Sequence, residues 1–231
     1  GSTTQTFAPW NAAVSEYASW FDKVVFDPGV TAYGDLENFL YGCTNVKWVD
    51  MSKLEIADKT TSIEQILAGA TGIEHVYMAD GVGVYPTETN GVTIPGAHSD
   101  GTVSGAQAQS GIAILPSGLN QSSGTPTLVN AKSAFANMPN LIDVRISGVG
   151  NANMATMTNM FSGSFADDEN TSLYIANSGN ADGADLTNMA SGLPNLRKIE
   201  LTNVGNGDAS NLTEMLANDT RLKSVALTEV G

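Results

Sequence analysis

The chain has 231 residues, of which 42% are hydrophobic, and this size and composition are typical of one folded domain with a substantial core. Its formal net charge is −14, with ten Lys and Arg residues against 24 Asp and Glu residues. A duplex nucleic acid or an anionic membrane would therefore meet net repulsion. No apolar run reaches the length of about 18 residues that a membrane span needs, so we expect no direct membrane insertion.

The first predicted element is a helical cap over residues 1–20. Trp10, Val14, Tyr17 and Phe21 recur at helical spacing, which places them on one face. A stack of repeats leaves an open apolar end, and an amphipathic segment of this kind suits its cover. We therefore expect these aromatic side chains to pack as a cap rather than to bind a ligand.

A phrase of the form apolar-x-x-apolar-x-apolar then recurs along the chain. Its middle residues follow one another at steps of 25, 27, 68, 29, 26 and 26 residues and are Val24, Val49, Val76, Val144, Leu173, Ile199 and Val225. A period of about 20 to 30 residues with this phrase is typical of leucine-rich repeats, which have one short strand per repeat. The period predicts repeats over residues 21–78 and 129–231, within a single domain spanning residues 1–231.

A second phrase precedes most of these strands and predicts a short helix in each repeat. Its copies begin at Asp35, Ser62, Asn130, Thr156, Asp185 and Asn211. Asp, Ser and Asn favour helix starts, and the Gly or Asn at the other end favours helix termination. Cys43, the only cysteine, lies on the apolar face of the first copy, where we expect a buried thiol. Because the chain has a single cysteine, an internal disulfide and a thiolate metal cluster are excluded.

Because one repeat cannot bury both its helix face and its strand face, the units must stack. The predicted fold is an α/β leucine-rich-repeat solenoid. Parallel strands would form its concave face, short helices its convex face, and the helical cap its N-terminal end.

The period fails over residues 79–128, which are rich in Gly, Ser and Thr. Short β-branched runs end in Pro86, Pro95 and Pro116 within this interval. Gly and Pro residues around short β-branched runs favour a hairpin-bearing insertion, or one degenerate repeat followed by a loop. A flexible spacer agrees with the composition equally well, so the sequence leaves the structure of this insertion open.

The combined helix-and-strand phrase resembles the BspA-like leucine-rich repeats, including the related mycoplasma-type surface lipoprotein repeat. The resemblance is carried by MTNMFSG at residues 157–163, by LTNMASGLPNLRKIELTNV at residues 186–204, and by residues 36–51, with their Gly42-Cys43 pair. It implies a non-enzymatic bacterial protein, secreted or at the cell surface, that acts in adhesion or protein recognition. A host or cell-surface protein, or a glycan, would then be the partner.

The sequence predicts no catalytic residue, no cofactor and no metal. The two histidines, His75 and His98, accompany no nucleophile motif, and the acidic run at residues 167–169 is typical of a solvated turn. Oxygen donors surround Gly183 as in cation-binding loops, but the glutamate of an EF-hand is missing. Asp185 in that loop is also an expected helix cap.

The best candidate for a ligand site is the strand face that points away from the core. Side chains alternate along a strand, so the residues beside each middle position share this face. Those before it are Lys23, Trp48, His75, Asp143, Ser172, Lys198 and Ser224, and those after it are Val25, Asp50, Tyr77, Arg145, Tyr174, Glu200 and Ala226. We expect Trp48, His75 and Tyr77 to cluster on adjacent strands, with Arg145 and Tyr174 further along.

Aromatic residues and Arg dominate the hot spots of protein recognition, and Trp or Tyr rings also stack on sugars. We therefore predict ligand binding by Trp48, His75, Tyr77, Arg145 and Tyr174, although β-propensity alone also enriches strands in aromatics. Protein recognition through this face or the insertion is the leading hypothesis. A glycan-binding module and an architectural spacer in a longer surface protein are the alternatives.

The chain stops on a predicted strand, residues 222–230, that no obvious cap follows. Truncation of a longer protein or end-to-end pairing of this strand is the expectation from that pattern.

Overall fold

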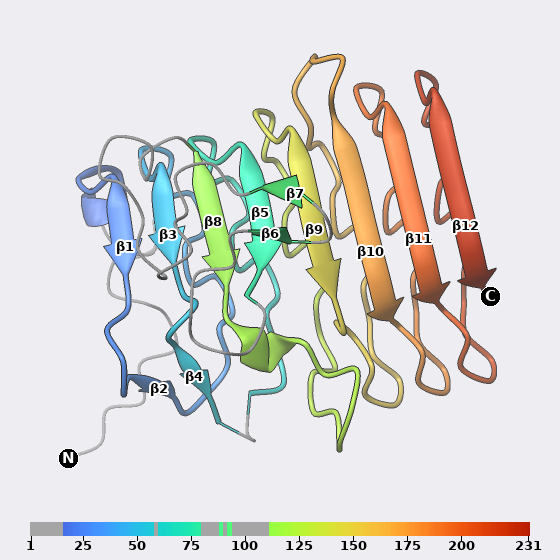
Figure 1. Ribbon diagram of the computed structural model, residues 1–231, viewed down its shortest axis with the longest axis horizontal. Helices are drawn as coiled ribbons and strands as arrows, with labels where there is room; N and C mark the ends of the chain where they lie inside the picture. The colour runs from blue at the N-terminus through green and yellow to red at the C-terminus, as the bar shows by residue number, and fades with distance from the viewer. Residues whose placement is uncertain (1–15, 58–59, 80–87, 90–91, 94–110) are drawn as a thin grey trace.

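A computed structural model describes residues 16–57, 60–79, 88–89, 92–93 and 111–231. Its main feature is an eight-stranded parallel sheet with the order β1-β3-β8-β5-β9-β10-β11-β12 (Figure 1). The strands are β1 (Lys23–Val25), β3 (Trp48–Asp50), β8 (Ile112–Leu115), β5 (His75–Met78), β9 (Asp143–Ser147), β10 (Ser172–Ser178), β11 (Lys198–Val204) and β12 (Ser224–Val230). The protein is thus a mostly parallel sheet with few helices, which agrees with the coarse α/β class.

Four shorter strands form two small sheets beside the main one. β2 (Thr31–Ala32) pairs in parallel with β4 (Glu55–Ile56), and β6 (Glu88–Thr89) pairs antiparallel with β7 (Val92–Thr93). The helices of the described residues are two 3-10 turns, η1 (Glu16–Ser19) and η2 (Ser117–Leu119).

The seven predicted strands all exist, and their register follows the predicted phrase. Val24 pairs with Val49, Leu173 with Val144 and Ile199, and Ile199 with Val225. Aligned middle residues form an apolar column that is fully buried from Val49 to Ile199. The column is the physical reason for the period, because a slip of one residue would turn every apolar side chain out of the core.

The short helices predicted before the strands are wrong. Each segment is instead a run of tandem β-turns, here called a turn row; the first closes its turns from Phe39 N to Leu36 O (3.3 Å) and from Tyr41 N to Asn38 O (3.2 Å). Asn38 has a φ of 54°, which an α-helix does not allow. The turn rows begin at Asp35, Ser62, Asn130, Thr156, Asp185 and Asn211.

Backbone hydrogen bonds between neighbouring turn rows explain why turns replace helices. Every second N–H of the first row donates to a carbonyl of the next, as from Leu36 N to Ser62 O (2.9 Å) and from Asn38 N to Glu64 O (2.9 Å). The same pattern joins the later rows in sequence order. Amides used between rows are not available for the i to i−4 bonds of a helix.

The interrupted interval contributes a strand to the main sheet, out of chain order. β8 pairs with β3 on one side and with β5 on the other, so Ala113 lies between Val49 and Val76 (Figure 1). The turn rows that precede β3 and β5 are nevertheless bonded directly to each other. Between β3 and β5 the sheet therefore carries a strand, β8, that no turn row matches. The flexible-spacer interpretation is wrong for β8, whereas the hairpin interpretation agrees with β6 and β7.

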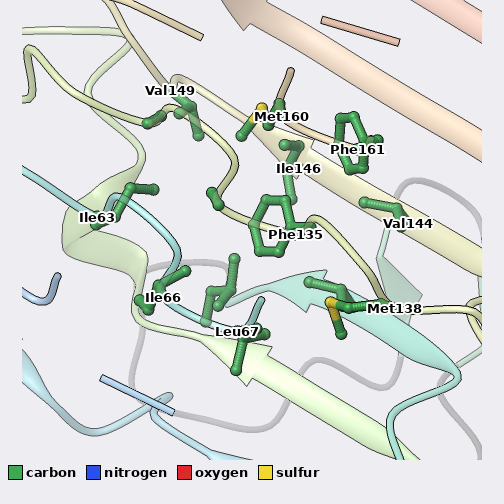
Figure 2. Close-up of a cluster of buried hydrophobic side chains, with 14 of the residues drawn as sticks. Ile63, Ile66, Leu67, Phe135, Met138, Val144, Ile146, Val149, Met160 and Phe161 are labelled. Carbon is green, nitrogen blue, oxygen red and sulfur yellow. The ribbon is translucent and has the colours of Figure 1, made fainter. Parts of the chain in front are cut away.

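Apolar side chains from the sheet and from the turn rows fill the space between them (Figure 2). The Phe135 and Phe161 rings, from successive turn rows, stack with centroids 5.5 Å apart. Cys43 is completely buried in this main core, as predicted, and burial raises the pKa of its thiol to about 11.

Most of the predicted N-terminal cap, residues 1–15, lies outside the described residues. The part that is described is the 3-10 turn η1, in which Ala18 is buried against the main core.

Candidate functional site

The sheet face opposite the turn rows, here called the outer face, carries the five predicted binding residues. Strand register arranges its side chains in two lines. One line runs Lys23, Trp48, Ile112, His75, Asp143, Ser172, Lys198 and Ser224, and the other runs Val25, Asp50, Ile114, Tyr77, Arg145, Tyr174, Glu200 and Ala226. The prediction that Trp48 lies beside His75 on an adjacent strand is wrong, because Ile112 of β8 separates them.

The outer face of β3, β8 and β5 is buried rather than open. A second apolar cluster forms there, in which Trp48 is 2% exposed, Tyr77 is 1% exposed, and Ile112 and Ile114 are fully buried. Trp48 and Tyr77 do point away from the main core, as expected, but neither offers the accessible ring that a ligand would need. The apolar run of β8 is typical of a strand that is buried on both faces.

A polar network continues the outer face from β5 onto β9 and β10. The Tyr77 hydroxyl lies 3.3 Å from His75 Nδ1, and the two rings stack with centroids 6.0 Å apart. Arg145 Nε donates to Asp143 Oδ2 at 3.0 Å, and the Ser172 hydroxyl donates to Asp143 Oδ1. The carboxylate of Asp143 is thereby held from both sides in a largely buried position.

The environment of this network keeps its ionisable groups in defined states. Burial lowers the pKa of His75, against the opposing effects of Asp143 and Glu74, so the imidazole is neutral at pH 7. Burial also raises the pKa of Tyr77, with a further contribution from Asp143. The network is therefore neutral apart from the Asp143–Arg145 ion pair.

Ser172, Asp143 and His75 lie side by side on neighbouring strands, but their bonding differs from that of a catalytic triad. A triad needs histidine between the nucleophile and the carboxylate, so that the imidazole can take the hydroxyl proton. Here the Ser172 hydroxyl donates to Asp143, and the Nδ1 of His75 faces Tyr77. This order does not place the imidazole beside the Ser172 hydroxyl, as a triad would.

The accessible part of the outer face begins at Arg145 and Tyr174. The Arg145 guanidinium carbon lies 5.9 Å from the centroid of the Tyr174 ring, a cation–π geometry. Both side chains are partly exposed, as is Glu200, while Lys198 and Ala226 are exposed. Lys198 Nζ pairs with Glu200 at 3.4 Å. These five residues, on β9 to β12, are here called the open face.

The acidic run at residues 167–169 is more than a solvated turn. Asp167 accepts hydrogen bonds from Arg197 (3.1 Å) and Arg221 (2.9 Å), and Glu169 pairs with Lys223. Because these partners lie one and two repeats further along the chain, the run links three successive repeats.

The loop considered for a cation uses its oxygens for backbone hydrogen bonds. Asp182 Oδ1 accepts from Asp208 N (3.1 Å), Asn180 Oδ1 from Asn206 N (3.0 Å), and Asp185 Oδ1 from Thr187 N (3.0 Å). Within the described ranges no group of three or more His, Cys, Asp or Glu side chains is placed to hold a metal ion.

Ile112 and Ile114 are the residues of this face that sequence reasoning missed. The only available signal was the apolar run after Gly111, whose alternation differs from that of the repeats.

Among the described residues, no helix has the length and the hydrophobicity that a membrane span requires. Comparison with protein-family models, with curated proteins and with solved structures gave no match.

Proposed function

We propose that the chain is a leucine-rich-repeat solenoid of the BspA-like type that acts in adhesion or protein recognition outside a bacterial cell, without enzymatic activity. The period, the resemblance of the repeat phrase and the parallel sheet support this proposal.

The observation that carries the proposal is the rigid presentation of Arg145 and Tyr174 on the open face. Asp143 fixes the Arg145 side chain, and the cation–π contact fixes the guanidinium against the Tyr174 ring. Side chains that are already ordered lose little entropy on binding, and Arg and Tyr are common hot-spot residues. The open face therefore suits a protein partner with an acidic or aromatic contact residue.

A glycan is the second candidate, and it has less support. Sugar rings stack on exposed aromatic rings, but Trp48 and Tyr77 are buried, which leaves the partly exposed rings of Tyr174 and His75 among the five predicted residues.

Selection of a phage-displayed peptide library on the purified protein, with a glycan array in parallel, tests the proposal. We expect selected peptides to bind the double variant Arg145→Ala/Tyr174→Ala at least about tenfold more weakly. Lys132→Ala, an exposed change on a turn row, is the matched control and should leave the affinity unchanged.

Three outcomes contradict protein recognition by the open face. Saturable binding to a glycan without peptide enrichment would favour the glycan module, and no binding to either library would favour the architectural spacer. Equal affinity of the wild type and the folded double variant would move the binding site elsewhere.

A further inference from the structure

A polar hollow lies at the carboxyl end of the sheet, between the loop that follows η2 and the ends of β9, β10 and β11 (Figure 1). Its volume is about 260 Å³, near the lower end of the range for small-molecule sites. The loop supplies residues 121–124 and Pro126 to its lining, and the strand ends supply Asn151, Asn177, Asn180 and Asn203. Because no lining residue is ionisable or aromatic, the hollow offers a ligand amide, hydroxyl and main-chain groups.

The loop wall of the hollow is fixed against β9 by hydrogen bonds. Asn120 Nδ2 donates to Ser147 Oγ (2.9 Å), and Gln121 N donates to Gly148 O (2.9 Å). A Cβ at Gly148 would overlap Asn120 Oδ1, so the loop approaches this strand end more closely than a side chain would permit. Gln121 Oε1 also closes the loop by accepting from Thr127 N (2.9 Å). A wall that is already fixed lowers the entropic cost of binding.

The strand wall consists of two columns of asparagines that use their amides differently. Asn151 and Asn180 follow their strands and bond to the main chain; Asn180 Oδ1 accepts from Asn206 N (3.0 Å), and its Nδ2 donates to Asn203 O (2.9 Å). Asn177 and Asn203 lie within the ends of β10 and β11, at φ values of 48° and 53°. Asn206 Nδ2 donates to Asn203 Oδ1 (2.8 Å), and Asn203 Nδ2 donates to Asn177 Oδ1 (2.9 Å). These side chains form a directed chain of amides that runs toward the hollow.

The chain of amides ends at the hollow with an unused donor. Asn203 donates to Asn177 of the repeat before, but the next position in that direction is Gly148, which has no side chain to accept from Asn177. Asn177 Nδ2 makes no hydrogen bond to a described residue, and neither does Ser123 Oγ on the opposite wall. Both residues are exposed, so these two groups are available to a ligand.

The chemistry of the hollow favours a neutral ligand with several hydroxyl groups. An anion would meet no cationic side chain in the lining and a net charge of −14 on the chain, and the free amide N–H disfavours a cation. A sugar hydroxyl can accept from Asn177 Nδ2, and a neighbouring one can donate to Ser123 Oγ. A hollow of about 260 Å³ suits one sugar ring, whereas an extended peptide needs a longer groove.

We propose that this hollow binds one neutral sugar residue, with Asn177 Nδ2 and Ser123 Oγ as its polar contacts. The site is separate from the open face, and its ligand is additional to the protein partner proposed for that face. Because no aromatic ring lines the hollow to stack on the sugar, the expected Kd for a single sugar is on the order of 1 mM.

Saturation-transfer NMR and calorimetric titration of the whole chain test the proposal, with the methyl glycosides of glucose, galactose and mannose and with N-acetylglucosamine as probes. We expect at least one probe to bind saturably, one molecule per chain. Asn177→Gly removes the free donor and keeps a residue suited to a positive φ, and it should weaken binding about fivefold. Ser123→Ala should weaken it about threefold, and the double variant about tenfold or more.

Two controls separate this site from the rest of the molecule. Asn159→Gly makes the same change at an exposed turn-row residue with a φ of 54°, and it should bind the sugar like the wild type. Arg145→Ala/Tyr174→Ala, which disables the open face, should also leave sugar binding unchanged. Circular dichroism establishes that each variant is folded.

Four outcomes would overturn the proposal. The first is no saturable binding of any probe up to about 100 mM. The second is equal affinity of the wild type and the folded Asn177→Gly/Ser123→Ala variant. The third is loss of sugar binding in the open-face variant, which would place the sugar there. The fourth is saturable binding of N-acetyl-triglycine amide and of none of the sugars, which would indicate a site for peptide main chain.

Discussion

The two halves of the main sheet use the same strand phrase but differ on the outer face. β9, β10, β11 and β12 have five to seven residues each and follow chain order, whereas β1, β3, β8 and β5 have three or four and do not. In the C-terminal half the outer face is accessible at Tyr174 and Lys198, whereas in the N-terminal half it is buried at Trp48 and Tyr77. The half with regular repeats leaves its outer face accessible, whereas the half that contains β8 buries it around Ile112 and Ile114.

Tyr77 and Tyr174 lie on the same line of side chains, on the two sides of Arg145, and they provide the strongest test of this difference. Tyr77→Ala should lower the free energy of unfolding by about 3–5 kcal/mol, because it empties a buried site. Tyr174→Ala should cost less than about 1 kcal/mol, because the ring is partly in water already. Urea denaturation of both variants measures the two values; equal losses would mean that the halves are equally buried.

The entry to β8 provides the next test. Gly111 has a φ of 77°, and a Cβ there would lie 2.9 Å from Glu74 Cγ, whereas Gly124 has a φ of 84° and no atom within 4 Å. Gly124→Ala should lower the free energy of unfolding by about 1–2 kcal/mol, because alanine is strained in a left-handed backbone. Gly111→Ala should lower it by about 1 kcal/mol more, because Glu74 must also move. Thermal unfolding compares the two, and identical costs would show that β8 is loosely fitted.

Ionisable groups in the two halves should give opposite dependences on pH. Burial raises the pKa of Asp219 to about 6, although a hydrogen bond from Leu193 N opposes the shift. Between about pH 4 and 6 the folded state therefore holds a proton that the unfolded state has lost, so the stability contributed by Asp219 is lost as pH rises through this window. We expect Asp219→Asn to raise the free energy of unfolding by about 1–2 kcal/mol at pH 7, after allowance for the partial exposure of the side chain.

His75 in the N-terminal half has the opposite sign. Its folded pKa is lowered, so its stabilising contribution is present above the ordinary histidine pKa of about 6.5 and is lost as pH falls through the folded value. His75→Gln should weaken the loss of stability at acidic pH, and Asp219→Asn should weaken the loss toward neutral pH. Urea titrations in steps of pH measure both slopes, and parallel slopes would refute the assignment.

The ion pairs between repeats should give the smallest effect. Asp167→Asn should cost about 0.5–1 kcal/mol at low salt, since its carboxylate is 67% exposed although it meets two arginines. The cost should shrink in about 1 M NaCl, where exposed charges are screened. Glu214→Gln, an exposed change on the last turn row, is the control. A cost that does not depend on salt would point to packing by Arg197 instead.

The sequence predicted seven strands of the main sheet and the alignment of their middle residues, because each of the seven repeats the same apolar columns; it did not predict β8 between β3 and β5. It misassigned the turn rows, because their chemistry matches that of helices in two respects. Asp185 accepts Thr187 N at the start of its row as a helix cap would, and Gly192 has the positive φ of a helix terminus. Positive φ values inside the rows, as at Asn38, and the hydrogen bonds between rows distinguish the two, and those bonds depend on residues one repeat apart.

For the candidate site, alternation along the strands assigned Trp48, Tyr77, Arg145 and Tyr174 to the outer face. It could not indicate which of them are covered, because burial of that face depends on an element outside the period. β8 breaks the pattern with Ala113 at its middle position and isoleucines on the outer side. Whether the accessible residues bind a ligand stays a prediction.

The position of β8 also fixes the order in which the protein can fold. Strands β10, β11 and β12 each pair with the strand before them in the chain, so that half can form by closing short loops as soon as each repeat is made. β3 and β5 must wait for β8, which is synthesised after both and closes a loop longer than two repeats. The half that leaves the ribosome first is therefore expected to be completed late, and refolding should show a fast phase for the C-terminal repeats and a slower one for the N-terminal repeats.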